Sequence, residues 1–109
     1  MRVYDYDGPV LSTERDAVDL IGDVLSIGAE VVAVPVDLLD ADFFDLSTGL
    51  AGALMQKFVN YQLTLAVIGD ISEYVAASRA LHDLVYEVNH GNEVWFLPDH
   101  HALDARITA

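Results

Sequence analysis

The chain of 109 residues contains no cysteine. Disulfide frameworks, thiol nucleophiles and cysteine-based zinc sites are therefore excluded. The sequence also lacks a run of about 18 apolar residues, the length that a membrane-spanning helix needs. Residues 1–7 carry no apolar signal-peptide segment. We therefore expect a cytoplasmic protein that does not use a membrane as its partner.

Positive charge is scarce as well. Five lysine and arginine residues stand against 18 acidic residues, so the formal net charge is −13, and Lys57 is the only lysine. Such a chain repels nucleic-acid backbones and anionic lipid surfaces, and we expect neither as a partner. The acidic residues are scattered along the chain, which is typical of a solvated surface and not of an acidic tail.

Metal-ligand spacing is also missing. The four histidines, His82, His90, His100 and His101, form no i, i+4 pair, and no carboxylate spacing matches a metal motif. No nucleophile–histidine–acid order or phosphate-binding loop can be identified. We therefore predict no metal site, no cofactor and no catalytic residue, and we favour a protein without enzymatic activity.

Apolar residues are abundant and make up 53% of the chain. The length predicts a single domain over residues 1–109 that can bury roughly two thirds of its unfolded surface. The apolar fraction is high for so small a domain, which leaves apolar area to face a protein partner or a second copy of the chain. We expect a homodimer, because two-fold dimers are the commonest soluble oligomers.

Apolar periodicity predicts strands that alternate with helices. Strands are expected at 2–6, 30–36, 63–68 and 93–97, with a further short strand at 10–11 that pairs back on the first. Helical spacing is present at 17–25, 50–61, 77–88 and 99–106. This alternation is typical of a layered α/β structure with right-handed crossovers. We predict a mostly parallel central sheet flanked by about four helices.

Local signals support several of these boundaries. Thr13 followed by Asp16 resembles the residue pair that starts a helix, and Gly28 is placed to end that helix. Asp99 is expected to cap the last short helix.

The most unusual stretch is 42–61, which we interpret as a loop that runs into a helix. One face of this helix is apolar and comprises Leu50, Ala51, Leu54, Met55, Phe58 and Tyr61. Another face is small and polar and comprises Gly49, Gly52, Ala53, Gln56 and Asn60. Glycine inside a helix costs about 1 kcal/mol relative to alanine, so Gly52 needs a reason. Either a partner approaches the backbone there, or the helix packs tightly on a neighbouring strand.

Two hydroxyl residues, Ser47 and Thr48, stand where this helix is expected to begin. A hydroxyl at that place can cap free backbone N–H groups, and the same groups favour a bound anion or phosphoryl group. Lys57 can anchor an acidic ligand group or serve only to keep the surface soluble. Asp70 ends a predicted strand, where open α/β sheets bind ligands, although a solvated loop residue fits equally well.

The same stretch resembles the signature of an uncharacterised bacterial family, the domain of unknown function 4180. The resemblance is carried by Asp42-Phe43-Phe44-Asp45-Leu46, Thr48-Gly49-Leu50-Ala51-Gly52 and Gln56-Lys57-Phe58-Val59-Asn60-Tyr61. It continues through 65–70 and 87–91 and covers the chain from about Val18 onward. No activity is assigned to the family, so the resemblance implies no function.

A more distant similarity is to the STAS domains of anti-sigma-factor antagonists. Those domains carry an Asp-Ser-Ser-Gly-Leu-Gly-type motif at this place, and Asp45, Ser47-Thr48 and Gly49-Leu50-Ala51 are similar to it. The resemblance implies a STAS-like layered fold and a hydroxyl whose phosphorylation switches partner binding. Thr48 matches that hydroxyl, with Ser47 beside it.

Three functions are compatible with these features. The leading hypothesis is a non-enzymatic regulatory module that binds a protein partner through the surface between Phe43 and Asn60. The second is a small metal-free enzyme or ligand-binding protein with a polar pocket, and the third is a structural homodimer. An exposed phenylalanine patch would favour the first or third hypothesis, and a concave polar pocket would favour the second. The predicted binding or interface residues are Phe43, Phe44, Asp45, Ser47, Thr48, Gly49, Gly52, Gln56, Lys57, Asn60, Tyr61 and Asp70.

Overall fold

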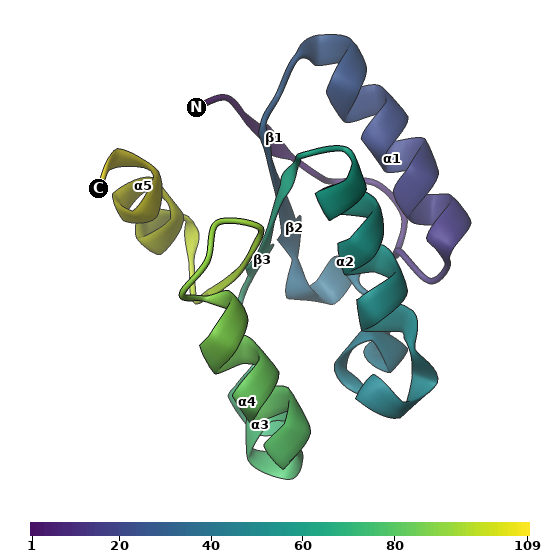
Figure 1. The fold of residues 1–109 in the computed structure, drawn as a ribbon, viewed down its shortest axis with the longest axis vertical. Coiled ribbons are helices and arrows are strands. Elements are labelled where there is room, and N and C mark those ends of the chain that lie inside the picture. The colour runs from purple at the N-terminus through teal and green to yellow at the C-terminus, as the bar shows by residue number, and fades with distance from the viewer.

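Four parallel strands form the centre of the structure, a computed structural model that describes residues 1–109 (Figure 1). The strands are β1 (Val3–Asp5), β2 (Val31–Pro35), β3 (Thr64–Ile68) and β4 (Val94–Leu97), and they follow the order β1-β2-β3-β4 across the sheet. Every neighbouring pair is parallel, with Val32 opposite Leu65 at the centre. The prediction of a mostly parallel sheet is confirmed, and the sheet is in fact parallel throughout.

Five α-helices connect and cover the strands. They are α1 (Glu14–Ile27), α2 (Leu50–Asn60), α3 (Ser72–Ala77), α4 (Arg79–Val88) and α5 (His100–Thr108). Short 3-10 turns at Val36–Leu38, Ala41–Phe44 and Leu46–Thr48 lead from β2 into α2. None of the helices combines the length and the apolar character needed to traverse a bilayer.

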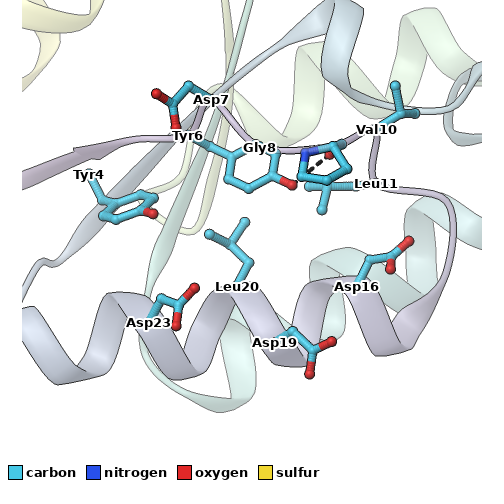
Figure 2. Close-up of a pocket in the computed structure, with 11 residues that line it drawn as sticks. Tyr4, Tyr6, Asp7, Gly8, Val10, Leu11, Asp16, Asp19, Leu20 and Asp23 are labelled. Atoms are coloured by element: carbon cyan, nitrogen blue, oxygen red, sulfur yellow. Dashed lines mark hydrogen bonds between the residues drawn. The ribbon is translucent and has the colours of Figure 1, made fainter.

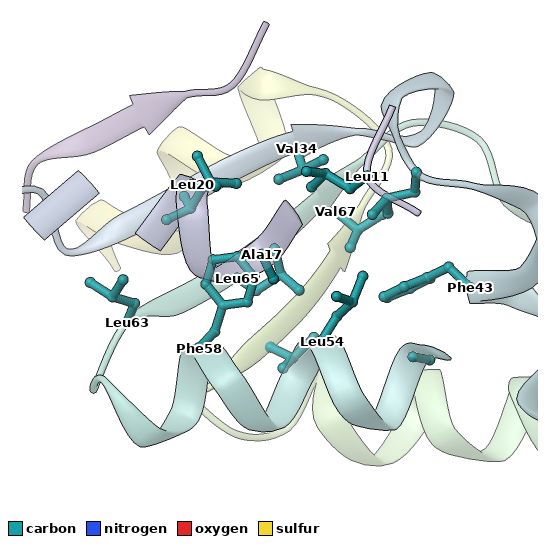
Figure 3. Close-up of a cluster of buried hydrophobic side chains, with 14 of the residues drawn as sticks. Leu11, Ala17, Leu20, Val34, Phe43, Leu54, Phe58, Leu63, Leu65 and Val67 are labelled. Carbon is teal, nitrogen blue, oxygen red and sulfur yellow. The ribbon is translucent and has the colours of Figure 1, made fainter. Parts of the chain in front are cut away.

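The sheet separates two apolar cores, because alternate residues of a strand point to opposite faces. Val32 and Val34 of β2 contribute to a core of 20 buried residues under α1, α2 and α4. Figure 3 shows Leu54 and Phe58 projecting into this core from α2. On the other face Val31, Ala33, Ala66, Ile68 and Trp95 pack with Leu103 of α5. The strands follow one another in sequence order, so right-handed crossovers place their connecting helices on one face and leave the other face to α5.

The predicted helix boundaries are confirmed where a specific side chain sets them. The Thr13 hydroxyl accepts a hydrogen bond from the Asp16 backbone N–H at 3.2 Å, and the Asp16 carboxylate accepts one from the Thr13 N–H at 3.1 Å. Gly28 ends α1 in the left-handed conformation, with φ of 73°. The Asp99 carboxylate accepts from Ala102 N–H at 2.8 Å and starts α5.

Two predicted elements differ in the structure. Leu11 does not pair back on the first strand but forms a single parallel bridge with Leu39, because β1 is paired with β2 and Leu11 itself is drawn into the core. The helix expected at 77–88 is α4, which begins at Arg79 because Ser78 caps it by accepting from Leu81 N–H at 3.1 Å, whereas the preceding α3 was not predicted. The six residues of α3 are too few to show a clear helical period.

The outer edge of β4 is closed by one side chain that the sequence did not single out. The Asn89 amide group donates to the Phe96 carbonyl at 3.2 Å and accepts from the Phe96 N–H at 2.7 Å. These two bonds replace those of a neighbouring strand and leave less of the edge free for another chain. The Arg106 guanidinium donates to the carbonyls of Asn89 and Gly91 at 2.5 and 2.8 Å, which ties α5 to the same turn.

Candidate functional site

Phe43 and Phe44, expected in an exposed interface, lie in the core. Their exposed fractions are 0% and 4%, because the 3-10 turn Ala41–Phe44 directs both rings inward. Phe44 stacks on Tyr74 with the ring centroids 4.2 Å apart, and the Phe43 ring lies 6.3 Å from that of Phe96. The structure thus lacks the exposed phenylalanine patch that would have favoured a protein-binding module or a structural homodimer, since the protein's own core covers both side chains.

Ser47 and Thr48 lie in the last 3-10 turn before α2, and their hydroxyls hold that turn together. The Ser47 hydroxyl donates to the Asp45 carboxylate at 2.6 Å. The Thr48 hydroxyl lies 2.7 Å from the Asp42 carbonyl and 2.9 Å from the Asp45 carbonyl, and it accepts from Leu50 N–H at 3.3 Å. Of the two hydroxyls, therefore, only that of Thr48 reaches the first turn of α2, and Ser47 does not cap this helix.

Gly49 follows these hydroxyls for a conformational reason. Its φ of 79° lies in the left-handed region, which residues with a Cβ rarely adopt. This conformation ends the 3-10 turn and starts α2 at Leu50. The glycine is thus explained by the backbone and not by a ligand.

The surface around the start of α2 is acidic. A shallow hollow of about 470 Å³ includes Thr48 and Gly49 together with Glu14 and Asp42. Lys57, the nearby base, lies 3.7 Å from the Glu14 carboxylate in a surface ion pair. Carboxylates surround the place where an anion would bind, so the electrostatics disfavour the bound-anion interpretation.

Gly52 faces open space in the first turn of α2. No atom lies within 4 Å of the position that a Cβ would occupy, so tight packing on a strand does not explain this glycine. The open space belongs to a groove of about 510 Å³ between α2 and α4, the largest cavity in the structure. We call it the α2–α4 groove. It is lined by Gly52, Met55, Gln56, Val59, Leu84, Glu87, Val88, Gly91, Glu93 and Val94.

The residues expected to form one polar pocket lie in separate places. Gln56 faces the groove and donates to Asn60 at 2.8 Å along α2. Asp70 lies at the carboxyl end of β3, beside a different cavity of about 350 Å³. Its carboxylate accepts from Ser72 N–H at 2.9 Å, and this bond lowers the pKa of Asp70. Thr48, Gln56 and Asp70 therefore line three separate cavities and do not share one pocket.

Tyr61 completes the set of predicted residues and lies at the end of α2. Its side chain is 49% exposed, so it is not part of the core to which the apolar face of α2 contributes. The buried residues of that face are Ala51, Leu54 and Phe58, as the periodicity predicted.

A further hollow, of about 290 Å³, lies between the β1 segment and α1 (Figure 2). Its walls include Tyr4, Tyr6, Asp16, Asp19 and Asp23. Burial and the neighbouring Asp16 carboxylate raise the pKa of Tyr6, whose hydroxyl donates to the Pro9 carbonyl. The three aspartates recur at helical spacing and therefore lie on one side of α1. This spacing is a sequence signal for a local acidic surface, and it was overlooked because the acidic residues as a whole are scattered along the chain.

The comparison with known protein families gives one match. The model of a domain of unknown function, DUF4180, matches residues 1–107. No curated protein and no solved structure matches, so the similarity to STAS domains stays a prediction. The family match extends over β1 and the start of α1, which lie before the region where the resemblance was clear from the sequence. This chain belongs to the DUF4180 family.

Proposed function

We propose that this chain is a non-enzymatic protein-binding module whose partner contacts α2 along the α2–α4 groove. The observation that carries the proposal is the open space beside Gly52 in the lining of the α2–α4 groove; Gly22 of α1 also faces open space but lines no groove. Glycine is a poorer helix former than alanine, yet no contact within the fold requires that a side chain be absent at Gly52. A partner that approaches the backbone of α2 closely gives this glycine a function.

The lining of the α2–α4 groove supports the same proposal. Met55 on one wall and Leu84 and Val88 on the other pack against the main core and remain partly exposed, and the partly exposed Val59 also lines the groove. Partly exposed apolar side chains around a concavity are the usual anchors of a protein interface, because a partner's side chains remove them from water. The proposed setting for this binding is the cytoplasm.

The proposal includes regulation at Thr48, the hydroxyl that the STAS resemblance assigns to a switch. Thr48 is exposed, and its hydroxyl joins the 3-10 turn to α2. A phosphoryl group adds about −1.5 to −2 charges, here beside Asp42 and Asp45. The repulsion would open the turn at the start of α2 and weaken the contact with a partner.

Two glycine variants test the proposal, because α1 contains a matched control. Gly22 lies inside α1 and, like Gly52, has no atom within 4 Å of its Cβ position. At both positions a Cβ meets no neighbouring atom, but only Gly52→Leu places a side chain in the α2–α4 groove. Wild type and both variants are immobilised and exposed to lysate of the source cells, and the captured proteins are compared by mass spectrometry.

We expect wild type and Gly22→Leu to capture a common set of proteins that Gly52→Leu does not retain. Circular dichroism of the three proteins confirms that the fold is unchanged. Identical capture by all three would show that the groove is not the binding surface.

A further inference from the structure

We infer that the α2–α4 groove receives an amphipathic α-helix of a partner protein that carries lysine or arginine beside its apolar face. This inference rests on the proposed function and names the chemistry of the partner. It follows from the shape of the groove, its lining, its charge and the way the edge of the sheet is closed.

The walls of the groove are two helices that run in the same direction on one face of the sheet (Figure 1). Met55 and Val59 are spaced i, i+4 on α2, and Leu84 and Val88 are spaced i, i+4 on α4, so each wall presents one apolar ridge. Ridges of this spacing are complementary to the grooves on the surface of a third helix. Helices recognised in such grooves supply apolar anchors at i, i+3 or i+4 and i+7.

Two glycines set how closely that helix can approach. Gly52 lies at the N-terminal end of the α2 wall, and Gly91 lies in the groove lining after α4. The distance between packed helices depends on the side chains at their contact. A wall without a side chain at Gly52 therefore allows the partner's backbone to come close to α2.

The charge of the groove specifies the flanks of the partner helix. Glu87 and Glu93 lie at its rim, both are exposed, and neither is in an ion pair. No basic residue lines the groove. Lysine or arginine on the partner would complement these carboxylates, and the net charge of −13 would accelerate its approach. A second copy of this chain carries the same negative charge and is disfavoured as the occupant.

The edge of the sheet argues against an added strand as the alternative. Asn89 already bonds the outward-facing N–H and carbonyl of Phe96 on β4, the strand nearest the groove. A peptide that extended the sheet at β4 would have to displace both bonds. A helix laid between α2 and α4 displaces none.

Two synthetic peptides test the inference directly. Each is about 18 residues long, so that it can form a helix, and each has leucine at a spacing of three and four. One carries lysine beside the leucine face and the other carries glutamate at the same positions. Fluorescence anisotropy of the labelled peptides gives dissociation constants for wild type, Gly52→Leu, Gly22→Leu and the double variant Glu87→Lys with Glu93→Lys.

We expect wild type and Gly22→Leu to bind the lysine peptide at least about tenfold more tightly than the glutamate peptide, a difference of about 1.4 kcal/mol. The double charge variant should reverse this preference, and Gly52→Leu should weaken the binding of both peptides. Because Glu87 and Glu93 are on the surface, the charge variant keeps the test decisive even if Gly52→Leu loses its fold.

Equal affinity for the two peptides, or a preference that the double charge variant does not alter, would overturn the inference. The inference would also be overturned if neither peptide bound while lysate capture still depended on Gly52. In that case the proposed function would stand. Capture that does not depend on Gly52 would instead count against the proposed function itself.

Discussion

At the scale of single residues, three glycines near α2 and in α1 differ in backbone conformation. Gly22 and Gly52 lie in ordinary helical conformation beside open space, whereas Gly49 has a φ of 79°. Alanine is therefore compatible with the first two positions and strained at the third.

We expect Gly52→Ala and Gly22→Ala each to raise the free energy of unfolding by about 1 kcal/mol, because alanine is the better helix former. Gly49→Ala should lower it by about 1 kcal/mol, since the left-handed conformation brings a Cβ too close to the following carbonyl. Urea unfolding followed by circular dichroism measures all three changes. A loss of stability in Gly52→Ala would mean that α2 packs more tightly at this point than the structure shows.

Substitutions of Thr48 can separate its contribution to stability from its proposed role in partner binding. Thr48→Ala removes the bond to Leu50 N–H and should cost about 1 kcal/mol of stability while preserving partner binding. Thr48→Ser keeps the hydroxyl and should preserve both properties. Thr48→Glu introduces a charge beside Asp42 and Asp45 and should weaken binding. Melting temperatures and dissociation constants of the variants separate these effects, and wild-type affinity in Thr48→Glu would end the proposal of a switch.

At the scale of secondary-structure elements, the start of α1 depends on one ionised carboxylate. The Asp16 carboxylate accepts hydrogen bonds from the backbone N–H groups of Ser12 and Thr13 at 2.8 and 3.1 Å, and these bonds lower its pKa below the ordinary 3.8. A lowered pKa in the folded state means that the stabilisation is fully present above pH 3.8 and is lost as the pH falls through the folded value.

We therefore expect Asp16→Asn to be less stable than wild type at pH 7 and to approach the stability of wild type as the pH falls below 3.8. Urea midpoints at pH 7 and near pH 3 measure this difference. Asp23→Asn is the control, because the Asp23 side chain takes no part in the helix start. A difference between wild type and Asp16→Asn that stays constant with pH would show that the ionised carboxylate is not what stabilises the start of α1.

Helix α5 is the only helix on its face of the sheet and has a small buried anchor, so we expect its attachment to depend on Arg106. Leu103 is its only fully buried side chain. Arg106 adds hydrogen bonds to the carbonyls of Asn89 and Gly91 and lies 4.7 Å over the ring of Trp95. The Trp95 indole is itself held by a 2.8 Å bond to Gly91.

Arg106→Ala should lower the free energy of unfolding by roughly 1–3 kcal/mol, because it removes bonds from a charged group and a cation–π contact together. Trp95 is the only tryptophan and is 3% exposed, so its fluorescence should shift to longer wavelength if α5 loosens. Arg79→Ala is the matched control, since Arg79 forms only an exposed pair with Asp83 at 3.6 Å and should change stability little. An unshifted Trp95 spectrum in Arg106→Ala would show that Leu103 alone holds α5 on the sheet.

At the scale of the whole molecule, the assembly state remains to be measured, and we expect a homodimer. Val18 and Leu25 are exposed on α1, and their i, i+7 spacing places them on one side of the helix. This surface is separate from the α2–α4 groove and allows two copies to pack closely through α1. The charge of −13 on each copy opposes that contact, so salt should strengthen it.

Sedimentation equilibrium at high micromolar concentration should give twice the chain mass of 11.9 kDa. The association should strengthen at higher salt, and Leu25→Glu should disturb it while Gly52→Leu leaves it intact. A monomer at all salt concentrations would contradict the expectation.

The alternation of helices and strands was predictable because it depends on local periodicity and on end signals such as Thr13, Gly28 and Asp99. The order of the strands and the position of α5 were not, since both depend on contacts between residues distant in the chain. Helix α3 was missed because its six residues span fewer than two helical turns, which is too short to show an apolar period.

The candidate site shows even more clearly which features depend on local sequence and which depend on contacts between distant residues. The sequence by itself determined the composition of α2, with an apolar face for the core and a glycine on the opposite face, since both follow from helical spacing. Only the tertiary structure decided that Phe43 and Phe44 turn inward and that Gly52 borders a groove shared with α4. Periodicity specifies which side chains share a face, whereas packing against other elements determines which faces are covered and which are left open.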